Sequence, residues 1–148
     1  KQLRTQVDVD ATPERVWQVL TDFAAYPQWN PFIVRAEGDA RRGERLTLRM
    51  QPVGGRAITF RPTVLEAAPG RRLRWLGRLL VNGIFDGEHR FTIEPLGEGR
   101  ARLVQQEDFR GLLVPLMARS LDRRTLPAFE LLNQALKRRA EQPASQRG

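Results

Sequence analysis

The feature that most restricts the fold of this chain is a change of hydrophobic period near residue 113. From Phe32 to Phe109, apolar side chains recur at every second position and are interrupted by short turns, a pattern typical of successive antiparallel strands. From Val114 to about Ala140 they recur at helical spacing. The chain must therefore lay a long amphipathic helix on one face of an antiparallel sheet.

The residues before Phe32 predict one further strand and two short helices. Leu3–Asp10 alternates between apolar and polar side chains. In ATPERVWQVL, Thr12 is a natural helix N-cap and Pro13 a natural first helical residue. A second short helix or turn, DFAAYPQW, is expected to end at Pro27. Six strands are then expected, at Phe32–Glu37, Glu44–Gln51, Ala57–Ala67, Arg71–Leu80, Ile84–Glu94 and Arg100–Phe109.

Two prolines modify this prediction. Pro62 suggests that the strand Ala57–Ala67 lies at an edge or contains a bulge. Pro127 removes a backbone hydrogen bond from the long helix and predicts a kink near Arg123–Arg124. The predicted fold is α+β, with a seven-stranded curved antiparallel sheet wrapped around the C-terminal helix. One helix cannot fill such a sheet, so we expect a cavity between them that opens near the short helices.

The length of 148 residues fits one domain, expected over residues 1–141 with a disordered tail at 142–148. The chain has no cysteine and one histidine, which excludes disulfides, thiolate catalysis and multi-histidine metal sites. It also lacks a phosphate-binding glycine loop and a G-x-S-x-G motif. Ser120 and Ser145 are the only serines, so nucleophilic serine catalysis is not expected. We predict no cofactor and no metal.

The net charge of +8 raises the possibility of an RNA or ribosome partner. The basic residues are nearly all arginines spread along the chain with acids between them, so nucleic acid is not the partner that we expect. No apolar run approaches the roughly 18 residues that span a bilayer, and no secretory apolar segment is present at the start of the sequence. We expect a cytoplasmic monomer or homodimer.

The stretch FDGEHRFTIEPLGEGRARLVQQEDF places polar residues on an apolar face. His89 alternates in phase with Phe85 and Phe91, and Gln105 and Glu107 share one face of the next strand. If the hairpin is in register, His89 lies near Gln105 or Glu107. Such a contact could orient His89 as a general base, serve as a structural pair under the helix, or form a polar inner wall that holds a carbonyl or hydroxyl of a ligand.

The remaining wall of the cavity is expected to be apolar. Trp75, central on the sheet, and Met117, on the inner stripe of the helix, are the preferred cavity residues, since methionine adapts to different ligands. Trp17 is expected to anchor the first helix to the sheet. The full set of predicted ligand-binding residues is Trp29, Phe32, Met50, Phe60, Trp75, Phe85, His89, Phe91, Gln105, Glu107, Phe109, Leu113, Met117 and Leu121.

The sequence resembles the START/Bet v 1-like (SRPBCC) superfamily of polyketide cyclase/dehydrase and lipid-transport type, in a bacterial branch. The resemblance is carried by VDVDATPERVWQVLTDFAAYPQWNPF, LRWLG, FDGEHRF and QEDFRGLLVP, and covers Leu3 to about Ala140. It implies a helix-grip fold and a hydrophobic ligand cavity, but not one chemistry. We therefore expect binding or carriage of a hydrophobic small molecule or lipid. The alternatives are a polyketide cyclase or dehydratase that uses His89 and Glu107, and a ribosome- or RNA-associated module.

Overall fold

The structure is a computed structural model that describes residues 1–79 and 83–143. Its antiparallel strands form a larger sheet in the order β1-β8-β7-β6-β5 and a smaller sheet in the order β2-β3-β4. The strands are β1 Gln2–Val9, β2 Ile33–Glu37, β3 Thr47–Met50, β4 Ile58–Phe60, β5 Thr63–Ala68, β6 Arg72–Leu79, β7 Phe85–Gly97 and β8 Arg100–Arg110. The α-helices are α1 Pro13–Thr21, α2 Tyr26–Trp29, α3 Val114–Ser120 and α4 Leu126–Glu141.

The α+β class, the antiparallel pairing and the long C-terminal helix are confirmed, but the prediction of a single seven-stranded sheet was wrong. The predicted strand Ala57–Ala67 is divided into β4 and β5 at Arg61–Pro62. Pro62 has no backbone N–H to donate to a neighbouring strand. The chain therefore leaves the smaller sheet at this point and joins the larger one. Only the carbonyl of Pro62 is used, accepting a hydrogen bond from Leu46 N at 2.8 Å.

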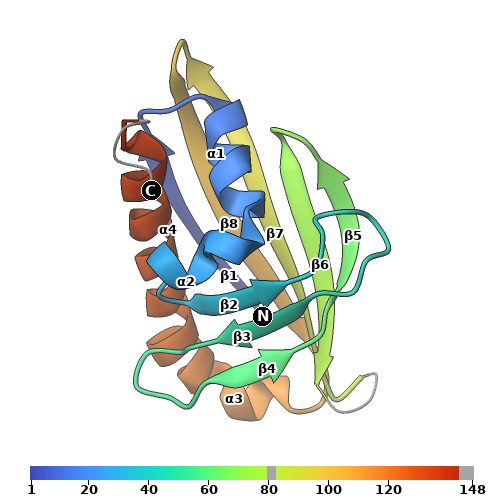
Figure 1. The fold of residues 1–148 in the computed structure, drawn as a ribbon. Helices are drawn as coiled ribbons and strands as arrows, with labels where there is room; N and C mark the ends of the chain where they lie inside the picture. The colour runs from blue at the N-terminus through green and yellow to red at the C-terminus, as the bar shows by residue number, and fades with distance from the viewer. Residues whose placement is uncertain (80–82, 144–148) are drawn as a thin grey trace.

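The C-terminal helix is interrupted where Pro127 predicts a kink. Between α3 and α4, residues Leu121–Thr125 form a π-helical turn, in which Leu126 N donates to Leu121 O. A turn of this kind accommodates the donor that proline lacks. The loop between β3 and β4 docks on this turn, because Val53 N donates to Arg124 O at 2.9 Å. Figure 1 shows α3, β4 and this loop together at one end of the molecule.

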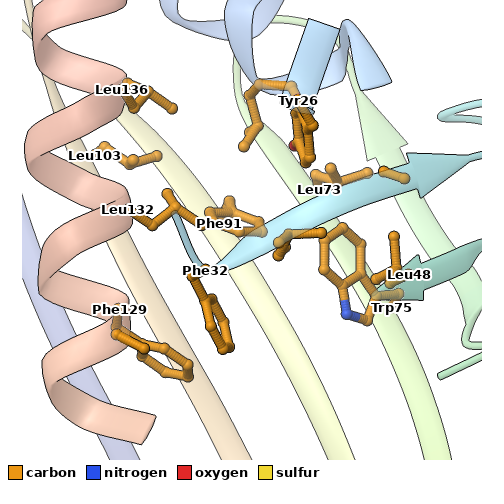
Figure 2. Close-up of a cluster of buried hydrophobic side chains, with 14 of the residues drawn as sticks. Tyr26, Phe32, Leu48, Leu73, Trp75, Phe91, Leu103, Phe129, Leu132 and Leu136 are labelled. Atoms are coloured by element: carbon orange, nitrogen blue, oxygen red, sulfur yellow. The ribbon is translucent and has the colours of Figure 1, made fainter. Parts of the chain in front are cut away.

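The core lies between α4 and the larger sheet. Figure 2 shows Phe129, Leu132 and Leu136 of α4 directed toward the strands, where they face Leu103 and Phe91. All five side chains are fully buried, and each buried side chain of this size contributes about 1.5–3 kcal/mol. The helix rests mainly on β1, at the edge of the larger sheet. On the side toward β5 this sheet contacts the smaller sheet instead, since β4 packs against β6 and Arg45 forms a bridge with Thr63.

The short helices pack tightly against the sheets. Thr12 caps α1 by accepting a hydrogen bond from Arg15 N at 3.1 Å, as predicted. Tyr26 is fully buried, and its hydroxyl donates to the carbonyl of Leu20. The Tyr26 ring lies 5.4 Å from that of Phe23 and 5.2 Å from that of Trp29, edge to face in both cases. Aromatic side chains thus fill the space under the short helices.

Candidate functional site

A cavity of about 220 Å³ lies between the two sheets and the broken C-terminal helix. Its wall is mainly apolar. For comparison, an apolar cavity of roughly 150 Å³ binds benzene, so this one has room for about two fused rings. The residues that line it are Phe32, Met50, Pro52, Gly55, Arg56, Ile58, Phe60, Pro62, Trp75, Gly77, Phe85, Gly87, Glu107, Phe109, Met117, Ser120, Leu121, Arg124 and Thr125.

The cavity opens beside the π-helical turn. Four of its lining residues are exposed, namely Arg56, Ile58, Ser120 and Arg124. They belong to β4, the loop before it, the end of α3 and the π-helical turn. No lining residue comes from α1 or α2, the two short helices before β2. The prediction that the cavity opens near those helices was therefore wrong. The physical reason is the aromatic packing around Tyr26, which closes that end.

Two glycines provide part of the free volume. Gly77 of β6 and Gly87 of β7 are paired across the larger sheet and both line the cavity. A side chain at either position would project into the space that a ligand needs. At Gly87 a Cβ atom would lie only 2.6 Å from Glu107 Oε2, so the absence of a side chain also makes room for this carboxylate. Alternation places both glycines on the inward face, and this signal could have identified them from the sequence.

Nine of the predicted ligand-binding residues line the cavity, namely Phe32, Met50, Phe60, Trp75, Phe85, Glu107, Phe109, Met117 and Leu121. The other five are Trp29, His89, Phe91, Gln105 and Leu113, which lie elsewhere. Trp29 packs beside Tyr26, Leu113 lies just before α3, and Phe91 is fully buried in the core. His89 and Gln105 are fully buried behind the cavity wall.

The predicted contact of His89 with the neighbouring strand is confirmed. His89 lies directly opposite Glu107 in the ladder, and its Nδ1 is 3.1 Å from Glu107 Oε1. Its Nε2 is 2.9 Å from Gln105 Oε1. The histidine ring is also enclosed by three aromatic rings, those of Phe91 at 4.6 Å, Phe129 at 5.0 Å and Trp75 at 5.2 Å. His89 is thus held by hydrogen bonds on both sides and does not reach the cavity.

The polar chain continues from Gln105 to the C-terminal helix. Gln105 Nε2 donates to Asn133 Oδ1 at 2.8 Å and to the Phe129 carbonyl at 3.3 Å. Asn133 Nδ2 in turn donates to Thr5 Oγ1 at 2.8 Å. The sequence analysis missed Asn133 and Thr5, although Asn133 is a polar residue on the buried stripe of α4. Buried polar groups need such partners, so the chain connects α4 to β1, β7 and β8.

Of the residues that these hydrogen bonds connect, only Glu107 lines the cavity. Its side chain is 12% exposed, and within the described residues Oε2 has no hydrogen-bond partner. A carboxyl group with one oxygen fixed and the other open can bind a hydrogen-bond donor or exchange a proton with a bound molecule. The described residues contain no group of three side chains that could hold a metal ion.

Several arginines on the outer face of the larger sheet are paired with acids. Arg74 contacts Glu66 at 3.0 Å and Glu88 at 2.9 Å, and Arg102 contacts Asp8 at 2.8 Å. The hydrogen bond with Arg102 lowers the pKa of Asp8. These pairs interrupt the positive charge on this face. In the described part of the chain, no helix is both long and apolar enough to span a membrane.

A family model described as polyketide cyclase / dehydrase and lipid transport matches residues 1–141. A START superfamily protein from Mycobacterium smegmatis is 29% identical, with a TM-score of 0.75 over 95% of this chain and 97% of that one. The Zhui aromatase/cyclase from Streptomyces sp. R1128 is 22% identical, with a TM-score of 0.79 over 99% and 98%. At that identity the likeness shows the fold alone. No curated protein matches the chain significantly.

Proposed function

Because the chain belongs to the family of polyketide cyclase/dehydrase and lipid-transport proteins, we propose that it binds a hydrophobic small molecule or lipid in the cavity between its sheets and C-terminal helix. The observation that carries this proposal is an apolar cavity that opens at one end and that has, among the described residues of its wall, a single carboxyl group, that of Glu107. Ligand sites of this kind combine a mostly apolar lining with a few polar groups that orient the ligand.

Two features of the cavity support binding rather than simple imperfect packing. A void of about 220 Å³ is larger than those found in a well-packed interior. The two paired glycines then leave space where side chains could have filled the wall. An empty apolar cavity also costs stability in proportion to its volume, and a bound apolar molecule would recover that cost.

A cavity-filling variant tests the proposal. In Met117→Trp the indole would occupy much of the cavity, whereas Leu131→Trp places the same ring on α4 at a side chain that is 49% exposed. We expect 2-methoxynaphthalene to bind the wild type and Leu131→Trp alike in equilibrium dialysis, and to bind Met117→Trp at least about tenfold more weakly. Native mass spectrometry of the purified protein would show whether a hydrophobic compound co-purifies. Equal binding to all three proteins would place the compound outside the cavity and contradict the proposal.

A second candidate function is proton transfer to or from a bound substrate, as in a cyclase or dehydratase. The contact between Glu107 and His89 favours it, because a carboxyl group supported by an imidazole can act as a general acid or base. Glu107 would contact the substrate, and His89, which is fully buried, would position it. No nucleophile in the described residues joins this pair, and the serine at the opening, Ser120, lies on α3.

Exchange of the α-protons of 2-tetralone in D₂O, followed by NMR, tests this second function. This bicyclic ketone matches the size of the cavity. A general base contributes typically 10²- to 10⁴-fold, so we expect an acceleration of about that size in the wild type and its loss in Glu107→Gln. Glu130→Gln, the same change at an exposed residue of α4 that does not line the cavity, should retain it. Binding of 2-tetralone without faster exchange would reject catalysis and leave the binding function in place.

A further inference from the structure

Within the ligand cavity, we propose that Glu107 Oε2 is the binding point for a neutral hydroxyl group of the ligand, and that the polar chain behind Glu107 keeps this oxygen a hydrogen-bond acceptor. This inference rests on the proposed binding function and goes further, because it assigns the chemical class of the ligand. It follows from the donors and acceptors along the chain formed by Glu107, His89, Gln105 and Asn133.

The amide group of Gln105 determines that His89 Nε2 carries a proton. The backbone carbonyl of Phe129 can only accept a hydrogen bond, so the nitrogen of the Gln105 amide must face it, at 3.3 Å. The oxygen of that amide therefore faces His89 Nε2, at 2.9 Å. Because an amide oxygen has no proton to donate, Nε2 carries one. The position of α4, through Phe129 and Asn133, thus selects the tautomer of the only histidine in the chain.

The contact between His89 and Glu107 requires a further proton. A neutral imidazole that is protonated on Nε2 has only a lone pair on Nδ1, and Nδ1 lies 3.1 Å from Glu107 Oε1. A bare carboxylate would bring two acceptors together, so one further proton lies between these atoms. That proton makes the pair either an imidazolium with a carboxylate or an imidazole with a carboxylic acid. In both arrangements Oε2 carries no proton and accepts a hydrogen bond.

The net charge of the pair of His89 and Glu107 determines which charge a ligand group at Oε2 can carry. The pair of His89 and Glu107 has no net charge in either arrangement. An ammonium group at Oε2 would have to leave water without a net opposite charge to compensate it. A carboxylate would find no donor there. A neutral hydroxyl group supplies the donor that Oε2 lacks, and its transfer from water costs less than that of a charged group.

The location of Oε2 agrees with this assignment. It lies beside Gly87 on the inner wall, 2.6 Å from where a Cβ atom of that residue would be. The surrounding wall is made of aromatic side chains, including Trp75, Phe85 and Phe109. A flat apolar body can therefore stack within the cavity while its hydroxyl group points at Glu107. The cavity volume limits that body to about two fused rings, unless the ligand extends through the opening.

Three compounds of almost the same shape test the assignment on the unmodified protein. 2-Naphthol carries the hydroxyl donor, 2-methoxynaphthalene keeps the oxygen but has no donor, and naphthalene has neither. A hydrogen bond from the hydroxyl group to Oε2 corresponds to about 5- to 100-fold in affinity, with the carboxylic acid arrangement at the lower end of this range and the carboxylate at the upper end. In equilibrium dialysis near neutral pH we expect 2-naphthol to bind more tightly than the other two by about that factor.

Variants locate the effect at Glu107. In Glu107→Leu the preference for 2-naphthol over its methyl ether should fall to within about threefold. The matched control is Glu130→Leu, the same change at an exposed residue of α4 that does not line the cavity, and it should retain the wild-type preference. Equal binding of the three compounds by the wild type would overturn the hydroxyl assignment and leave the binding function intact. Binding of none of them would overturn both. Because the wild-type comparison needs no variant, a poorly folded Glu107→Leu protein would not prevent a decision.

Discussion

Replacing Gln105 by leucine should destabilise the protein strongly although the two side chains are similar in size. Gln105 is fully buried and bonds to His89, Phe129 and Asn133. Leucine would leave His89 Nε2 and Asn133 Oδ1 without their partners. A buried polar group that loses its partner costs about 1–3 kcal/mol, so the two together cost about 2–6 kcal/mol. That is a large part of the 5–15 kcal/mol that typically stabilises a domain.

Urea unfolding followed by circular dichroism measures this effect. With an m-value of about 2 kcal/mol/M, the midpoint should fall by about 1–3 M. The matched control is Gln106→Leu, since Gln106 is the next residue on the opposite face, is half-buried and has no side-chain hydrogen bond within the described residues. Its midpoint should change little. If Gln105→Leu lost no more stability than Gln106→Leu, the polar chain would not be a stabilising element and the reasoning from unpaired groups would fail.

Two further predictions concern pKa values and a third concerns the tautomer of His89. Burial raises the pKa of Tyr26 above its ordinary value of 10.0. The contribution of the neutral phenol to folding stability is therefore complete below pH 10.0 and is lost as the pH rises further. The absorbance of tyrosinate should appear only together with unfolding, and its appearance in the folded protein would contradict this. The hydrogen bond from Arg102 lowers the pKa of Asp8 below 3.8. The stabilisation of the fold by ionised Asp8 is therefore present above pH 3.8 and is lost as the pH falls through the lowered pKa. Asp8→Asn should lose less stability on acidification than the wild type, and an unchanged acid response would refute this. The single imidazole signal set in ¹⁵N NMR should show a proton on Nε2 of His89 near neutral pH, and an unprotonated Nε2 would refute the assigned tautomer.

The sequence was sufficient to predict which strand residues face each other. Alternation places His89 and Glu107 on inward faces, and the short turn between β7 and β8 sets their register. Alternation along the strands does not predict the contact between Gln105 and Asn133. That contact depends on how α4 is rotated and positioned over the sheet, which is determined by contacts between residues distant in the sequence. The partner of Gln105 on the helix was therefore missed.

The position of the cavity opening could not be predicted from hydrophobic periods either. Periodicity identifies buried faces but does not show how completely side chains fill the space behind them. The rings of Tyr26, Phe23 and Trp29 close the end that we expected to be open. Pro62 had a similar effect on the strand count, since its missing donor indicates a disturbance without showing that the chain changes sheets there.

The attachment of the β3–β4 loop to the helix break has a consequence for how a ligand enters. Gln51 Nε2 donates to the carbonyls of Pro52 and Gly55, at 3.0 Å and 2.7 Å, so the loop is braced internally. One main-chain hydrogen bond, from Val53 to Arg124, joins it to the helix. We expect the loop to swing outward as a stiff flap when that bond opens, with both sheets unchanged. Loop opening would then occur in nanoseconds to microseconds, so it would not limit the exchange of a bound guest, and no partial unfolding would be needed.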